Sequence, residues 1–74
     1  MEEKFKRYVT IQYSGMYNMI VDAHKVMEAT SIKLDDYIYI QEHYNELKTN
    51  YPKEFEEGKT LGQEMYDKMY GEEE

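Results

Sequence analysis

A stripe of bulky side chains with helical spacing is the feature that most constrains the fold of this chain. Its members recur at intervals of three and four residues over four turns: Tyr37, Ile40, Tyr44, Leu47 and Tyr51. Residues at this spacing share one face of an α-helix, whereas a strand needs alternation at every second residue. The stripe predicts a helix over residues 36–51, with Asp35 as its N-cap and Pro52 as its end. Ile38 lies off the stripe, so it is either buried on a second side or exposed for a partner.

Two further segments have amphipathic helical patterns. Residues 16–30 form the clearer one, because six apolar side chains share a face: Met16, Met19, Ile20, Ala23, Val26 and Met27. Ser14 is placed to cap this helix at its N-terminus. Residues 61–70 repeat an apolar side chain every four positions, and we expect Gly58 to end a short preceding turn in a left-handed conformation.

The first segment, residues 2–13, has features of both helix and strand. Two glutamates precede Lys6 and Arg7 by four positions, which is the favourable order for ion pairs on a helix. Residues 8–13 are rich in β-branched and aromatic side chains, but a lone strand would lack a partner. We therefore predict helix. The four segments predict an all-α fold, a small single-domain bundle of three to four short helices with an acidic tail at residues 72–74.

The composition indicates a core rich in aromatic and thioether side chains and excludes cysteine chemistry. Nine tyrosines and six methionines supply apolar area in a chain of 74 residues that has no cysteine. Disulfides, thiolate zinc sites and thiol nucleophiles are therefore excluded. The N-terminal segment lacks the apolar core of a signal peptide, and no apolar run approaches the length of a membrane span. We expect a cytoplasmic protein that does not bind membranes.

The net charge of −7 is unevenly distributed along the chain. Residues 1–33 carry five basic and four acidic side chains, whereas four lysines face twelve carboxylates from residue 34 onward. Binding to DNA or RNA needs a positive field, so direct nucleic-acid binding by the acidic half is disfavoured. Two interpretations stay open. The acidic side chains either keep the protein soluble or dock it onto a basic surface of another protein.

The residues that could support catalysis or metal binding do not form a recognisable motif. His24 and His43 each have a glutamate within one helical turn, but no sequence order typical of a helical metal site is present. Ser14 and Ser31 stand where helix caps are expected, and the four glycines form no phosphate-binding loop. We predict no enzyme activity, no cofactor and no metal site.

The tyrosines outside the core stripes point to protein contacts. Exposed tyrosines beside carboxylates are common at protein interfaces, although a small domain also leaves its tyrosines half-buried by default. Stacking of nucleic-acid bases on these rings is disfavoured by the negative charge around them. The predicted partner-binding residues are Glu54, Glu56, Glu57, Glu64, Tyr66, Asp67 and Tyr70. The alternative is a structural module that self-associates, as a homodimer, through Ile38 and the tyrosine faces.

Two stretches of the sequence resemble parts of short, functionally unassigned proteins from phages and prophages of Gram-positive bacteria. They are the turn at residues 14–19 and the aromatic, acidic segment at residues 34–44, and the resemblance covers about residues 4–51. It implies a setting in which small acidic proteins bind and inhibit host proteins, including CRISPR effectors and nucleases, sometimes by imitating the charge of DNA. On this basis we expect an inhibitor of a host protein that has a basic surface.

Overall fold

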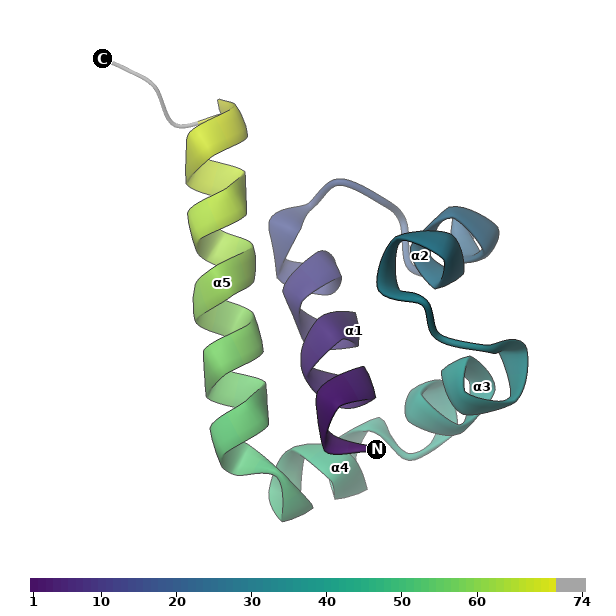
Figure 1. Cartoon of the computed structure of the whole chain (residues 1–74). Helices are drawn as coiled ribbons and strands as arrows, with labels where there is room; N and C mark the ends of the chain where they lie inside the picture. The colour runs from purple at the N-terminus through teal and green to yellow at the C-terminus, as the bar shows by residue number, and fades with distance from the viewer. Residues whose placement is uncertain (71–74) are drawn as a thin grey trace.

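The computed structural model describes residues 1–70 of the chain, and within them every regular element is an α-helix (Figure 1). The all-α class is therefore confirmed, but the helices number five rather than three or four. Their bounds are α1 Glu2–Ser14, α2 Ala23–Thr30, α3 Leu34–Glu42, α4 Tyr44–Asn50 and α5 Pro52–Tyr70. The first segment is thus helix and not strand. The predicted acidic tail at residues 72–74 lies outside the described residues.

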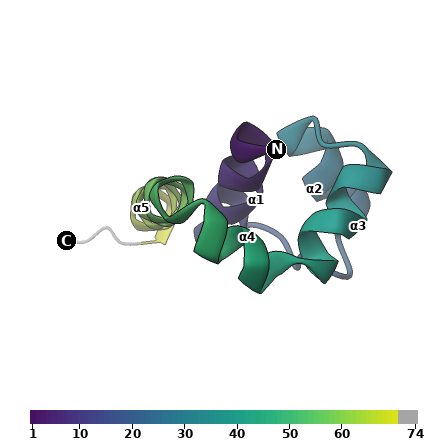
Figure 2. The same ribbon diagram turned by 90° about the horizontal axis from the view of Figure 1, so that it is seen from below.

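The helices form a ring with one long helix at its side. Seen from below, α1, α2, α3 and α4 lie around a common centre, and α5 stands outside the ring against α1 (Figure 2). Helices α1 and α5 run parallel to each other along most of the length of α1 (Figure 1). Because the last turn of α5 extends past the end of α1, its apolar side chains Met69 and Tyr70 stay about half exposed.

The core joins the ring to α5, and four of its nine buried residues are aromatic while five are aliphatic. Its buried residues come from all five helices and from the segment between α2 and α3: Phe5, Tyr8, Val9, Val26, Ile32, Tyr37, Ile40, Leu47 and Phe55. The expected contribution of methionine is wrong for this buried set, which contains none. The Phe5 ring lies 5.7 Å from the Tyr44 ring and 6.5 Å from the Phe55 ring, measured between centroids. Such aromatic pairs add stability beyond the apolar area that they bury.

The predicted helix over residues 16–30 is wrong in its first half. Gly15 ends α1 in the left-handed conformation, with φ of 70°, and α2 begins only at Ala23. The buried Ser14 hydroxyl donates to a carbonyl of α1, so this residue belongs to the end of α1 rather than to a new helix. In the intervening loop the Asn18 side chain accepts hydrogen bonds from two backbone N–H groups. These side-chain bonds replace the bonds that a helix would have made.

The predicted helix over residues 36–51 is divided in two at His43. This residue has φ of −115° and ψ of 27°, outside the helical region, and it separates α3 from α4. The first helix also begins one residue before Asp35, which lies in its first turn, while Lys33 takes the N-cap position. The apolar stripe still continues across the break, because Tyr37, Ile40 and Leu47 are all buried, and Tyr44 and Tyr51 are partly buried.

The predicted helix over residues 61–70 is part of the much longer α5. Pro52 begins this helix, and Gly58 lies inside it instead of ending it. Both Gly58 and Gly62 are buried against α1. A Cβ atom added at Gly58 would lie 2.7 Å from the Lys6 carbonyl oxygen. These glycines are therefore needed for the close approach of two helix backbones and not for a turn.

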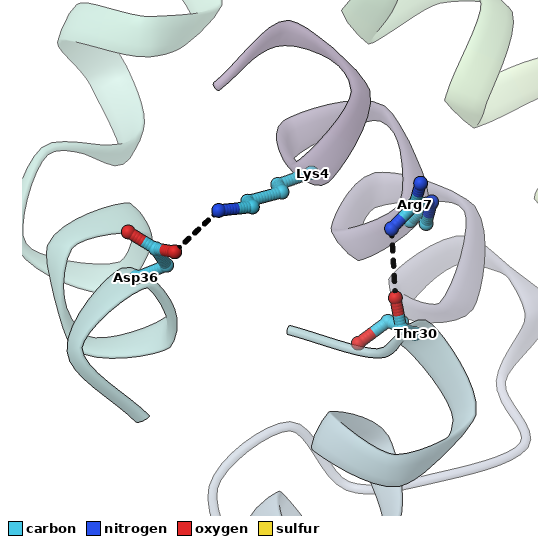
Figure 3. A network of polar contacts seen from close by, with 4 residues as sticks. All are labelled: Lys4, Arg7, Thr30 and Asp36. Carbon is cyan, nitrogen blue, oxygen red and sulfur yellow. Dashed lines mark hydrogen bonds and ion pairs between the residues drawn. The ribbon is translucent and has the colours of Figure 1, made fainter. Parts of the chain in front are cut away.

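Two polar contacts attach α1 to α3 and to the end of α2 (Figure 3). The Lys4 ammonium donates to a carboxylate oxygen of Asp36 at 2.6 Å, and this bond lowers the pKa of Asp36. The Arg7 guanidinium donates to the Thr30 carbonyl oxygen at 3.1 Å, at the end of α2. A cation at a helix C-terminus interacts favourably with the helix dipole. These bonds add to the apolar packing that holds α1 against the rest of the ring.

Candidate partner-binding surface

The seven predicted partner-binding residues all lie on α5, and we refer to them together as the α5 surface. Five of the seven are exposed, whereas Glu54 and Glu57 are half-buried. The helix also carries three lysines, so its five carboxylates give a balance of only −2. The acidic character of the second half of the chain is therefore shared with α3, which holds three carboxylates and no lysine or arginine.

Two neighbouring hollows lie between α1 and α5, and three of the predicted carboxylates line them. Glu56 and Glu57 line a hollow of about 400 Å³, together with Lys6, Thr60 and Leu61. Glu64 lines a hollow of about 280 Å³ together with Thr10, Leu61, Met65 and Lys68. Leu61 belongs to both hollows and is 43% exposed. This side of α5 thus combines an accessible apolar side chain with acidic groups.

One of these carboxylates is already paired within the protein. A carboxylate oxygen of Glu57 lies 3.3 Å from the Lys6 ammonium on α1. This pair places opposite charges across the α1–α5 contact and reduces the negative charge that Glu57 offers to a partner. Within residues 1–70, Glu56, Glu64 and Asp67 have no ion pair, so they are the stronger candidates for contact with a basic surface.

The two predicted tyrosines lie together but line neither hollow. The rings of Tyr66 and Tyr70 are 4.8 Å apart between centroids. Tyr66 of α5 packs beside the C-terminal end of α1. Its ring would be 3.2 Å from a Cβ atom added at Gly15. The structure therefore brings three of the five carboxylates of the α5 surface to the hollows, and it places the tyrosine pair further along the helix.

A third hollow, about 530 Å³, is lined by residues that the sequence did not single out. It is open to solvent and bordered by α1, the loop before α2, α3 and α4, and we call it the neutral hollow. Its lining residues are Tyr8, Gln12, Met19, Ile20, Gln41 and Tyr44. These positions span 37 residues of sequence, and no local motif connects them. Only the closure of the helical ring brings them together.

Burial changes the acidity of the tyrosines around the neutral hollow. Desolvation raises the pKa of Tyr44 to about 12, although the Gln12 side chain that accepts its hydroxyl at 2.8 Å acts in the opposite direction. Desolvation also raises the pKa of Tyr37 to about 12 and raises the pKa of Tyr8. All three hydroxyls therefore stay neutral hydrogen-bonding groups at physiological pH.

In the described part of the chain, the histidines and carboxylates form no cluster that resembles a metal site. His43 lies 3.1 Å from a carboxylate oxygen of Glu46, and its ring stacks on Tyr39. Within residues 1–70 no three histidine, aspartate or glutamate side chains come together in a way that could hold a metal ion. In the same part of the chain, none of the helices has the length and apolar character needed to cross a membrane.

Comparison with protein-family models, with curated proteins and with solved structures found no match for this chain.

Proposed function

We propose that this protein binds a basic surface of another protein through α5 and thereby inhibits it. The observation that carries the proposal is the position of Glu56 and Glu64 beside Leu61, where charge and accessible apolar area occur together. Apolar contact provides affinity, and complementary charge accelerates association and selects the partner. The resemblance to phage proteins supports a host nuclease or CRISPR effector as the target, because such enzymes present basic grooves to nucleic acid.

Charge reversal on α5 tests this proposal. A triple variant, Glu56→Lys, Glu64→Lys and Asp67→Lys, changes the net charge from −7 to −1 without touching the Lys6–Glu57 pair. A matched variant applies the same change elsewhere, at Glu2, Glu28 and Glu42, which are all exposed.

The wild type and both variants would serve as tagged baits in host lysate, and association with the captured protein would then be measured at several salt concentrations. We expect only the α5 variant to associate more slowly, with a weaker dependence on salt. The activity of the captured protein should fall when it is bound by the wild type or by the matched variant. Equal effects of the two charge reversals would show that the net charge matters and the α5 surface does not.

The competing function is self-association, and the exposure of α3 favours it. Ile38 and Tyr39 are adjacent on α3 and each is 42% exposed, so an apolar patch is open to a second copy. In this case Ile38→Ser should convert a dimer to a monomer in light scattering. A wild-type monomer at high micromolar concentration would rule this function out.

A further inference from the structure

The two hollows between α1 and α5 adjoin each other, and we call them together the α1–α5 groove. They share Leu61, and their other lining residues follow one face of each helix. On α1 this face carries Lys6 and Thr10, and on α5 it runs from Glu57 to Lys68. At a rise of about 1.5 Å per residue, the groove follows α5 for about 17 Å. This length suits a helical segment of roughly eleven residues.

The charges along the groove define the chemistry of its occupant. Glu56 and Glu64 are exposed, and neither makes an ion pair within residues 1–70. They stand eight positions apart, which is about 12 Å along the helix axis, with Leu61 between them. The Lys6 ammonium is already paired with Glu57 at 3.3 Å. The groove therefore favours two basic side chains on the occupant, with an apolar side chain midway between them.

Lys68 limits this acidic stretch at the far end of the groove. It lines the same hollow as Glu64, one helical turn further on, and makes no ion pair within residues 1–70. A third basic side chain placed there would meet a like charge, which is unfavourable. The groove thus favours basic side chains at two defined positions and not along its whole length.

The walls of the groove favour a helix over an extended segment. Both walls are helices, so their backbone N–H and C=O groups bond within each helix (Figure 1). An extended segment would find no sheet edge to pair with its own backbone groups. A helix satisfies these groups internally and places side chains seven positions apart on one face, about 11 Å from each other along its axis. That spacing is close to the spacing of Glu56 and Glu64.

We propose that the α1–α5 groove binds an amphipathic helix of a partner protein that carries two arginines seven positions apart, with an aliphatic side chain midway. The arginines bond to Glu56 and Glu64, and the aliphatic side chain packs on Leu61. Arginine is favoured because its planar guanidinium binds a carboxylate through two hydrogen bonds while its stem covers apolar surface. This inference rests on the proposed function, since it names the kind of segment that the α5 surface binds.

Two synthetic peptides of equal composition test the helical spacing. Both are alanine-rich and capped, and both contain two arginines, one leucine and a terminal tryptophan. In the first, the leucine stands four positions and the second arginine seven positions after the first arginine. In the second, the same three residues alternate with alanine, which is the spacing of one face of a strand.

Because the protein has no tryptophan, indole fluorescence comes from the peptide alone when protein is titrated into it. We expect saturable binding of the helical peptide that weakens as salt is added. The affinity of the alternating peptide should be lower by about 5-fold or more, because its two arginines cannot reach Glu56 and Glu64 together from one helix face.

A matched pair of leucine variants locates the binding. Leu61→Ser removes the apolar side chain that the two hollows share, at a position that is 43% exposed. The control, Leu34→Ser, makes the same exchange on α3, where the side chain is 57% exposed and lines neither hollow. We expect the affinity for the helical peptide to fall by about 3- to 10-fold in Leu61→Ser and to be unchanged in Leu34→Ser. Circular dichroism would verify that both variants are folded.

The possible failures of this inference and of the proposed function are distinguishable. Equal affinities of the two peptides would overturn the helical occupant and leave the proposed function intact, because a basic segment of either spacing would then bind α5. No saturable binding of the helical peptide, or equal effects of the two leucine variants, would overturn the assignment to the groove. The proposed function is tested separately, by charge reversal against the protein captured from lysate.

Discussion

At the scale of single residues, tyrosine hydroxyls connect distant segments of a chain that has no cysteine and therefore no disulfides. The buried Tyr37 donates to the Met19 carbonyl oxygen at 2.5 Å and so attaches the loop before α2 to α3. Tyr44 makes the corresponding bond to Gln12 and joins α4 to α1. A phenylalanine would fill similar volume without these bonds. The abundance of tyrosine thus supplies both apolar area and long-range hydrogen bonds in a chain without disulfides.

Tyrosine burial predicts a loss of stability at alkaline pH. The pKa values of Tyr37 and Tyr44 are about 12 in the folded protein and about 10 in the unfolded chain. Their contribution to stability is therefore complete below pH 10 and is lost as pH rises towards 12, because the unfolded chain releases these protons first. As pH rises towards 12, tyrosinate absorbance and far-ultraviolet circular dichroism should show the last tyrosines ionising together with the loss of helix. Tyr70→Phe should leave this transition unchanged. Ionisation of all nine tyrosines near pH 10 with helix retained would contradict this.

Removal of the Asn18 side chain, in the loop before α2, should cause a small loss of stability. Its Oδ1 accepts the backbone N–H groups of Ile20 and Val21, each at 2.9 Å. Asn18→Ala removes both bonds and should lower the free energy of unfolding by about 1 kcal/mol, whereas Asn18→Asp retains an acceptor and should lower it less. Urea unfolding would measure both variants. An Asn18→Ala variant as stable as the wild type would contradict a stabilising role for these two bonds.

At the scale of elements, the periodic stripe predicted which residues of α3 and α4 face the core, but residue patterns did not predict the start of α2, the break at His43 or the continuation of α5 through Gly58. Gly15 ends a helix, whereas Gly58 lies within one, although both follow plausible helical segments. The difference is tertiary, because α1 packs directly over Gly58. The same limit applies to function. The acidic residues of α5 could be predicted from sequence, whereas the neutral hollow depends on contacts between distant segments.

At Gly58 we therefore expect alanine to change the stability in the direction opposite to the one that helix propensity predicts. Alanine is better than glycine in an isolated helix by about 1 kcal/mol. In α5, however, a Cβ atom would lie 2.7 Å from the Lys6 carbonyl oxygen and 3.0 Å from the Val9 Cβ, so α1 would have to move. We expect Gly58→Ala to destabilise the protein by about 1–3 kcal/mol in urea unfolding. Thr60→Ala, at an exposed position of α5, is the matched control. A Gly58→Ala variant more stable than the wild type would refute the close helix contact.

At the scale of the whole molecule, the stability of the ring and of α5 depends on the same aromatic contacts. Phe5 is fully buried and lies beside Tyr44 of α4 and Phe55 of α5. A single core in a chain of this size supplies only about 3–5 kcal/mol of net stability. The loss of one central ring is therefore comparable in size to the total, and the helices should unfold as one unit.

A single substitution at the centre of this core should therefore unfold the whole molecule. Phe5→Ala removes a buried ring at a cost of about 3–5 kcal/mol, which is enough to leave the chain largely unfolded at 25 °C. Phe5→Leu keeps most of the volume and should stay folded with reduced stability. Tyr70→Ala, at a position 54% exposed, should match the wild type. Far-ultraviolet circular dichroism with thermal unfolding measures all three. If Phe5→Ala kept the helix content of the wild type and a cooperative transition, then α5 and the ring would not share one core, and the parallel contact of α1 with α5 would have to be stable without it.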